Sequence, residues 1–218
     1  MRLRNRPWAA PELADCPYYL SDFSRYRGHW REAFGNDRPI WLEIGCGKGL
    51  YLRGMASAHP ELNFIGADIK SLMLAYARRN IEQTYAASGM QVDNIILLSV
   101  DAERILSSFS EEDTVDRIIL NFSNPWPKPP HHKRRLTHPR QLENYKVFLR
   151  RGGIVEFKTD NDELYADSLD YFCEAGYSVD ENCFDYYSSH EIDTSIITEH
   201  EQKFMQLGLP IHYIRAIR

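Results

Sequence analysis

Residues 40–49 read I-W-L-E-I-G-C-G-K-G, and this stretch decides the fold class. A strand predicted at Ile40–Ile44 is apolar enough to be buried, and it runs directly into a loop with three alternating glycines. Glycine lets the backbone turn sharply and approach a ligand without a Cβ in the way. A predicted helix, Leu50–Ala58, follows the loop and is closed by Pro60. This order of strand, glycine loop and helix predicts the first unit of a parallel α/β sheet.

The same alternation of strands and helices continues along the chain. The further predicted strands are Asn63–Ala67, Asn94–Val100, Val115–Phe122, Ile154–Thr159 and two β-rich segments near Tyr177–Tyr187 and Ile211–Ile217. The predicted helices between them are Ser71–Ala87, Ala102–Phe109, Pro139–Leu149 and Asp160–Ala175. The pattern predicts the α/β class, with one Rossmann-like domain, a mostly parallel seven-stranded sheet and helices on both faces. Ligands of such sheets bind at the carboxyl ends of the strands.

Length and composition limit the possible organisation of the chain. Its 218 residues suffice for one α/β domain and are too few for two comfortable ones. No apolar run approaches the ~20 residues of a membrane helix, so no membrane partner is expected. The four cysteines are scattered, which favours reduced thiols and a cytoplasmic location. Residues 1–35 are rich in Arg, Tyr and Trp and are predicted to form a basic, aromatic arm, partly mobile until a partner orders it, before a domain of residues 36–218.

Positive charge is concentrated in one segment of an otherwise acidic protein. The net charge is -5, yet residues 125–142 contain no Asp or Glu and five basic residues, namely Lys128, Lys133, Arg134, Arg135 and Arg140. Such an asymmetry is the expected footprint of an acidic enzyme with one site for an anionic polymer. We therefore expect Lys133, Arg134 and Arg135 to contact a phosphate backbone.

Acidic residues stand at the ends of three consecutive predicted strands. Glu43 precedes the glycines, where its carboxylate can meet a positive group. Asp68 can accept both hydroxyls of a ribose, and Asp101 lies where it can reach an adenine edge. An adenosine that carries an ammonium and a sulfonium, but no phosphate, fits these acids. The pattern therefore favours S-adenosylmethionine, bound with Gly45 and Gly47, over a pyrophosphate-bearing dinucleotide. Each Asp taken singly is also compatible with a helix N-cap.

The segment after the fourth predicted strand is N-F-S-N-P-W-P-K at residues 121–128. Proline restricts both its own backbone and the residue before it, so Asn124 and Trp126 are predicted to be extended. A small polar residue followed by proline and an aromatic residue is suited to presenting a flat heteroaromatic ring beside a reactive centre. Three histidines follow at 131, 132 and 138, but no nearby acidic or cysteine partner accompanies them, and no metal site is predicted.

Four short motifs carry a resemblance to a known family, namely residues 121–128, H-K-R-R-L-T at 132–137, F-K-T-D-N at 157–161 and T-E-H-E at 198–201. Their order and spacing resemble the bacterial tRNA (guanine-N7)-methyltransferases, over nearly the whole chain. The resemblance implies methyl transfer from S-adenosylmethionine to N7 of a guanine in the tRNA variable loop, by a monomer or a homodimer.

The resemblance also implies roles for particular residues. The family's cofactor positions fall on Glu43, Asp68, Asp101 and Asn124, and its substrate positions fall on Lys128, Asp160, Thr198, Glu199, His200 and Glu201. Asn124 stands where the family usually has a catalytic Asp. Because N7 of guanine has a lone pair and no proton, no general base is needed. We therefore expect Asn124 to support the reaction in place of that Asp. Taken on its own residues, Thr198-x-x-Glu201 is more typical of a helix capping box.

Two other functions stay open on the sequence. A methyltransferase of the same fold could act on a small molecule or a protein, although such an enzyme would not use the basic segment. A catalytically impaired RNA-binding paralogue is the second alternative, and its support is the replacement of Asp by Asn124.

Overall fold

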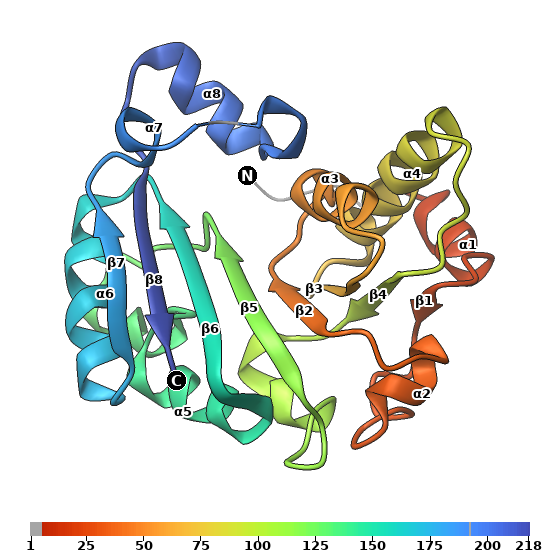
Figure 1. The fold of residues 1–218 in the computed structure, drawn as a ribbon, viewed down its shortest axis with the longest axis horizontal. Helices are drawn as coiled ribbons and strands as arrows, with labels where there is room; N and C mark the ends of the chain where they lie inside the picture. Colours follow the sequence, from red (N-terminus) through yellow and green to blue (C-terminus); the bar gives the residue numbers. More distant parts are fainter. Residues whose placement is uncertain (1–5, 192) are drawn as a thin grey trace.

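The computed structural model describes residues 6–191 and 193–218, which form an α/β domain (Figure 1). Its strands are β1 (Tyr19–Leu20), β2 (Ile40–Ile44), β3 (Asn63–Asp68), β4 (Ile95–Ser99), β5 (Val115–Asn121), β6 (Leu149–Thr159), β7 (Ser178–Cys183) and β8 (His212–Ile217). Its α-helices are α1 (Ala9–Ala14), α2 (Trp30–Phe34), α3 (Leu50–Ala58), α4 (Ser71–Ala87), α5 (Pro139–Phe148), α6 (Asp162–Glu174), α7 (Tyr186–Ser189) and α8 (Glu199–Leu207). Three 3-10 helices complete it, namely η1 (Ala102–Ser107), η2 (Pro129–Arg134) and η3 (Thr194–Ile196).

The strands form one sheet in the order β1-β4-β3-β2-β5-β6-β8-β7. Every pair from β1 to β6 is parallel, and β8 pairs antiparallel with both β6 and β7. The chain runs from β2 outward through β3 and β4 and then returns to pair β5 with β2. This return makes the β2–β5 pair the switch point of the sheet, where open α/β sheets bind their ligands. The prediction of a mostly parallel α/β sheet is confirmed.

Alternate residues of the parallel strands enter two cores on opposite faces of the sheet. In β3, Phe64 packs with residues of α3 and α4, whereas its neighbour Ile65 belongs to the core on the other side. That second core also includes Phe148 of α5 and Phe172 of α6. Figure 1 shows these two pairs of helices at opposite halves of the sheet. Burial on both faces explains why the strands read as continuous apolar runs.

The sheet has eight strands where the sequence predicted seven, because the segment before residue 35 contributes β1. Tyr19 and Leu20 pair in parallel with β4. Further on, Trp30 is buried and its indole Nε1 donates a hydrogen bond of 2.9 Å to the Ser108 carbonyl. The described part of the predicted arm thus packs on the domain through a two-residue strand and scattered buried side chains, which leave no periodic signal in a sequence. Residues 1–5, with their arginines, lie outside the described residues, and a role for the segment in binding a partner stays a prediction.

Two element predictions differ from the structure in detail. The helix predicted from Ala102 to Phe109 is a 3-10 helix that has a kink at Arg104 and ends at Ser107. Strand β6 begins at Leu149, before the Gly152-Gly153 pair, and its register with β5 shifts across that stretch. No helix within residues 6–191 and 193–218 is both long and apolar enough to cross a membrane.

Candidate active site

A cleft of about 710 Å³ opens at the carboxyl ends of β2 to β5, at the switch point of the sheet. One wall carries the glycine loop together with Asp68 and Asp101. The opposite wall carries Asn124 and Trp126. A smaller pocket of about 180 Å³, lined by Glu43, adjoins the cleft and shares Asn121 and other lining residues with it. The structure thus brings the predicted cofactor residues and the polar-Pro-Trp segment (Asn124, Pro125 and Trp126) into one depression.

The glycine loop faces the cleft with bare backbone. Gly45 and Gly47 have φ of 83° and 54°, a region that side chains disfavour. A Cβ at either position would meet nothing within 4 Å, so the space in front of the loop is open for a ligand. The amide of Gly45 donates to the Ala67 carbonyl at 2.8 Å, and that of Gly47 donates to Asp68 Oδ2 at 3.0 Å. These bonds fix the loop against the end of β3.

The aspartate that ends β3 and the one that comes shortly after β4 each hold a turn and still border the cleft. Asp68 accepts from the amides of Gly47 and Lys70, one at each oxygen, at 3.0 and 2.7 Å. Burial raises the pKa of Asp68, although both amide donors oppose the shift. Asp101 caps η1 by accepting from the Glu103 amide at 3.0 Å. A carboxylate oxygen has two lone-pair directions, so these bonds leave acceptor capacity for a ribose or an adenine.

Glu43 is a buried carboxyl group with an unused oxygen. Its residue is 3% exposed, and its Oε1 accepts a bond of 3.2 Å from Asn121 Nδ2. Among the residues that the structure describes, no group donates to Oε2. Burial raises the pKa of Glu43 to about 8, against the Asn121 hydrogen bond and with help from the charges of Glu201 and Asp68. An ammonium in the adjoining pocket would satisfy Oε2 and favour the ionised form. The unused carboxyl oxygen therefore fits the ammonium of the cofactor expected from the sequence.

The polar-Pro-Trp segment after β5 is held in an unusual backbone. Phe122 and Trp126 have φ of 51° and 43°, which non-glycine residues rarely adopt. The prediction of an extended Trp126 is therefore wrong. Contacts around the segment override the preference before proline. Locally, Asn124 Oδ1 accepts from the Trp126 amide at 3.0 Å, and the Arg134 guanidinium lies 5.0 Å from the centre of the indole ring. Because only the oxygen of an amide can accept that bond, Nδ2 of Asn124 remains free to donate.

The Thr198–Glu201 segment forms the capping box at the start of α8. Glu201 is buried; Oε2 accepts from the Thr198 amide at 2.6 Å and Oε1 pairs with Lys158 at 2.8 Å. Burial would raise the pKa of Glu201, but Lys158 and the Thr198 amide hold it below its usual range. Glu201 is 0% exposed and both of its oxygens already have partners, so its carboxylate is not presented to a guanine in this geometry. The substrate roles of Thr198 and Glu201 stay predictions.

The two residues between Thr198 and Glu201 line the smaller pocket. Glu199 receives two bonds from Lys48 Nζ, at 2.8 and 3.0 Å, and so ties α8 to the glycine loop. The His200 ring stacks on Phe122, with ring centres 5.4 Å apart and planes 14° apart. In Figure 1, α8 lies at the end of the sheet where β5 and β6 finish. The sequence singled out Glu199 and His200, but it gave no signal that Lys48 and Phe122 would be their partners.

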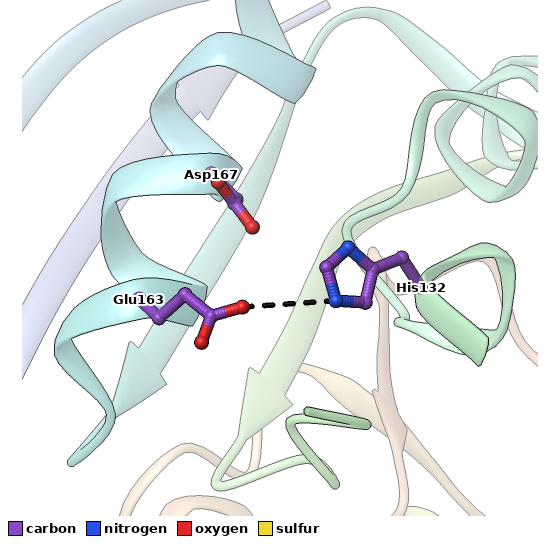
Figure 2. Close-up of side chains that lie close together, drawn as sticks. All are labelled: His132, Glu163 and Asp167. Carbon is purple, nitrogen blue, oxygen red and sulfur yellow. Dashed lines mark ion pairs between the residues drawn. The ribbon is translucent and has the colours of Figure 1, made fainter. Parts of the chain in front are cut away.

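Within the described residues, one group of side chains has the spacing of a metal site, namely His132, Glu163 and Asp167 (Figure 2). Their potential ligand atoms lie within 4.8 Å of one another. The guanidinium of Arg135, however, donates to all three of these side chains, including His132 Nε2 at 3.0 Å. The group already surrounds a cation of the protein itself, and a metal ion would have to displace it.

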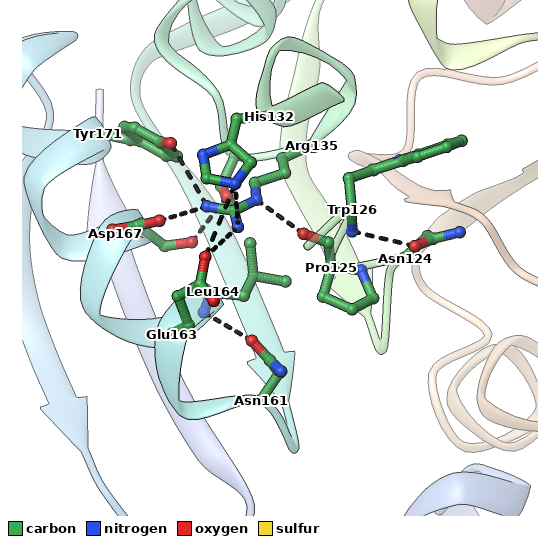
Figure 3. Close-up of polar contacts among 12 residues, drawn as sticks. Asn124, Pro125, Trp126, His132, Arg135, Asn161, Glu163, Leu164, Asp167 and Tyr171 are labelled. Atoms are coloured by element: carbon green, nitrogen blue, oxygen red, sulfur yellow. Dashed lines mark hydrogen bonds and ion pairs between the residues drawn. The ribbon is translucent and has the colours of Figure 1, made fainter. Parts of the chain in front are cut away.

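Arg135 is therefore not a contact for a phosphate backbone, and that prediction is wrong. Its side chain is 0% exposed and is enclosed between the polar-Pro-Trp segment and α6. Figure 3 shows the guanidinium among Pro125, His132, Glu163, Asp167 and Tyr171. The sequence could not separate it from its neighbour Arg134, because both belong to one basic run.

The other predicted substrate and backbone contacts lie on the surface. Lys133 and Arg134 are exposed and line the cleft, and Arg134 pairs loosely with Glu103 at 3.6 Å. Lys128 and Asp160 are exposed beyond the ends of β5 and β6 and do not line the cleft. Their roles in binding substrate stay predictions.

Comparison with known proteins agrees with this geometry. Residues 37–214 match a family model whose description is "Putative methyltransferase". A tRNA (guanine-N(7)-)-methyltransferase of Clostridium beijerinckii is 46% identical over 218 residues, which cover 100% of this chain and 99% of that protein. One of Acetivibrio thermocellus is 43% identical over 216 residues and 99% of each chain. The chain belongs to the tRNA (guanine-N7)-methyltransferase family.

Solved structures agree with family membership at the level of the fold. The 16S rRNA methyltransferase KamB is 14% identical, with a TM-score of 0.61 over 87% of this chain and 92% of that one. As a member of the tRNA (guanine-N7)-methyltransferases, the protein uses S-adenosylmethionine as its methyl donor. The acids and glycines at the strand ends fit that donor, as the unpaired Glu43 oxygen shows most directly.

Proposed function

We propose that the protein transfers a methyl group from S-adenosylmethionine to N7 of a guanine in the variable loop of tRNA. The observation that carries the proposal is the composition of one cleft. On the cofactor side two strand-end aspartates border the cleft, and the buried Glu43, with one unpaired carboxyl oxygen, lines the adjoining pocket. Asn124, Trp126, Lys133 and Arg134 border the other side. The full-length similarity to tRNA (guanine-N(7)-)-methyltransferases supports the same conclusion.

The cofactor side has the groups that each part of the methyl donor needs. Glu43 would hold the ammonium, Asp68 the ribose hydroxyls and Asp101 the adenine side, with Gly45 and Gly47 allowing close approach of the backbone. When bound, S-adenosylmethionine supplies an electrophilic methyl group. The residues of the chain then have to orient the methyl donor and the guanine and exclude other methyl acceptors, since N7 needs no deprotonation before it attacks.

Asn124 is proposed to orient the guanine. Its oxygen is occupied by the Trp126 amide, so its Nδ2 is the group available to the cleft. In Figure 3 this nitrogen lies on the side of the Asn124 amide group that faces away from the Trp126 backbone nitrogen. An amide donor suits O6 of guanine, which is an acceptor next to N7 in the major-groove edge. Lys133 and Arg134, exposed at the rim, are proposed to bind the phosphate backbone.

The test is methylation of an unmodified tRNA transcript with isotope-labelled S-adenosylmethionine, followed by digestion and nucleoside analysis. We expect the label in 7-methylguanosine. Two matched transcripts sharpen the test: one with adenine in place of the variable-loop guanine, and one made with 7-deazaguanosine, which lacks the N7 lone pair. Neither should accept the label. Label in another nucleoside, or in a protein or small molecule, would instead favour a methyltransferase for a different substrate, and the absence of any label would favour the RNA-binding paralogue.

A further inference from the structure

The basic run after β5 contains one arginine that faces inward. The guanidinium of Arg135 has five N–H donors, and five acceptors surround it. Its Nε donates to the Pro125 carbonyl at 2.7 Å, and its two terminal nitrogens donate to Glu163, Asp167, Tyr171 and His132. Since a guanidinium only donates, Nε2 of His132 accepts here, which fixes the proton of a neutral ring on Nδ1.

The acceptors of Arg135 come from two parts of the fold. Glu163, Asp167 and Tyr171 lie on α6, which packs against one face of the sheet in the same core as α5. Pro125 lies between Asn124 and Trp126, the two residues of the polar-Pro-Trp segment that border the cleft. Figure 3 shows the guanidinium bridging from the helix to the Pro125 carbonyl. The bridge thus joins a rigid helix to the backbone that carries the proposed guanine-binding amide.

This connection matters because the segment does not rest in a relaxed conformation. Trp126 has a φ of 43°, a conformation that non-glycine residues rarely adopt and that persists only when its surroundings impose it. The Asn124–Trp126 hydrogen bond is a first restraint, the Arg135 bond to the carbonyl between them is a second, and the Arg134 guanidinium over the indole ring is a third. Without the second restraint the segment could relax and move the Asn124 amide relative to the cleft.

We propose that Arg135 is a positioning residue for methyl transfer, which holds the Asn124–Trp126 segment in its reactive geometry by anchoring the Pro125 carbonyl to α6. The proposal rests on the proposed methyltransferase function. Arg135 does not touch the substrate or the cofactor. Its effect should therefore fall on the rate of the chemical step, and not on the affinity for tRNA or for the cofactor.

The experiment compares Arg135→Met and Arg135→Lys with the adjacent Arg134→Met. Methionine fills the volume of the arginine stem, and Glu163 and Asp167 are 56% and 36% exposed, so water can solvate the carboxylates that lose their partner. Lysine keeps the charge, but its compact ammonium cannot span the carboxylates and the Pro125 carbonyl together. Arg31→Met, at an exposed arginine paired with Asp37 far from the cleft, controls for loss of one positive charge.

Four quantities are measured on the full-length protein: the single-turnover rate at saturating tRNA and S-adenosylmethionine, tRNA affinity against salt, S-adenosylhomocysteine affinity, and ¹⁹F spectra of fluorotryptophan-labelled protein. Both Arg135 variants should react about 10- to 100-fold more slowly, because a misplacement of about 1 Å has effects of that size. Both affinities should stay within about twofold of the parent. The Trp126 signal, assigned with Trp126→Phe, should shift, while that of buried Trp30 should not.

The outcomes separate the proposal from its alternatives. A rate within threefold of the parent, with an unchanged Trp126 signal, would overturn it. So would a loss of tRNA affinity and salt dependence equal to that of Arg134→Met, because Arg135 would then be a phosphate contact. If Arg135→Met does not fold, Asp167→Asn removes one arm of the bridge and should show a smaller change in the same direction. A parent without activity on tRNA would refute the proposed function alone, since the ¹⁹F spectra still report whether Arg135 holds the segment.

Discussion

Binding of the cofactor should release a proton from Glu43. In the free protein, burial raises the pKa of this carboxyl group to about 8, so it is mostly protonated at neutral pH. A bound ammonium beside Oε2 favours the carboxylate and lowers that pKa again. For a ligand amine with a pKa of about 7.8, linkage gives a net release of about 0.8 protons at pH 7 and an apparent affinity that rises about eightfold from pH 6 to pH 7.

The assay is titration calorimetry with S-adenosylhomocysteine, which keeps the amino group and cannot react. Measurements in two buffers with different ionisation enthalpies give the number of protons released at each pH. Glu43→Gln should bind about 10- to 150-fold more weakly, since a hydrogen bond to a charged group contributes about 1.5–3 kcal/mol, and it should lose the proton release. Glu111→Gln, at an exposed carboxylate outside the cleft, is the matched control and should behave like the parent.

The reasoning fails if the parent releases no proton between pH 6 and pH 7 and its affinity is flat over that range. It also fails if Glu43→Gln keeps the full release, because another group would then be titrating. Asp68 is the alternative, since burial raises its pKa too. A parallel titration of an Asp68→Asn variant would identify it.

Four further predictions follow from the same geometry. Glu43→Gln should raise the melting temperature of the free protein, measured by scanning calorimetry, at pH 9 but not at pH 4. The raised pKa of Glu43 gives the folded state stability that is present below the unfolded pKa and is lost as pH rises through about 8. By linkage, the stability lost between these pH values is up to about 5 kcal/mol. Asp68→Ala should weaken S-adenosylhomocysteine binding by about 1.5–3 kcal/mol without loss of the fold, and unchanged affinity would remove Asp68 from the site. Lys133→Ala and Arg134→Ala should each reduce the salt slope of tRNA binding by about 1, and a salt-insensitive affinity would contradict the backbone role of this rim. Single-turnover rates of the parent should be flat from about pH 5.5 to 8, and Asn124→Asp should introduce a fall at the acid end; a steep acid limb in the parent that the variant leaves unchanged would mean that another group controls the chemistry.

The sequence predicted the fold and the cofactor side well because both depend on local signals. Strand β2, helix α3 and helix α4 begin and end where the apolar patterns and the prolines predict. The acids and glycines fall at strand ends, and a parallel sheet brings all such ends to one edge. Their convergence therefore follows from the topology alone. The buried state of Glu43 and its raised pKa do not, because they depend on what packs around the strand.

The substrate side was predicted less well because its residues act through tertiary contacts. Arg134 and Arg135 are adjacent and identical in sequence, yet one lies over an indole ring at the rim and the other is enclosed beside α6. The acids that pair with Arg135, Glu163 and Asp167, lie about 30 residues further along the chain. Glu201 shows the converse case, since its capping box follows from the local Thr198-x-x-Glu201 pattern and the structure forms it. The local rule was correct here because both partners of the capping box lie within four residues of each other.

The geometry is compatible with asparagine at a position where the family resemblance implies an acid. One atom of the side chain at position 124 is committed to the Trp126 amide, and either an amide or a carboxylate oxygen can accept that bond. The two residues differ in the second atom, which borders the cleft: Asp presents a negative oxygen, whereas Asn124 presents an N–H donor. A negative oxygen would stabilise the positive charge that methylation creates on the guanine ring. A donor would instead bind O6 and orient the ring before methylation. Because no proton has to be removed from N7, both solutions leave the reaction possible, and the cost of the exchange is a loss of charge stabilisation.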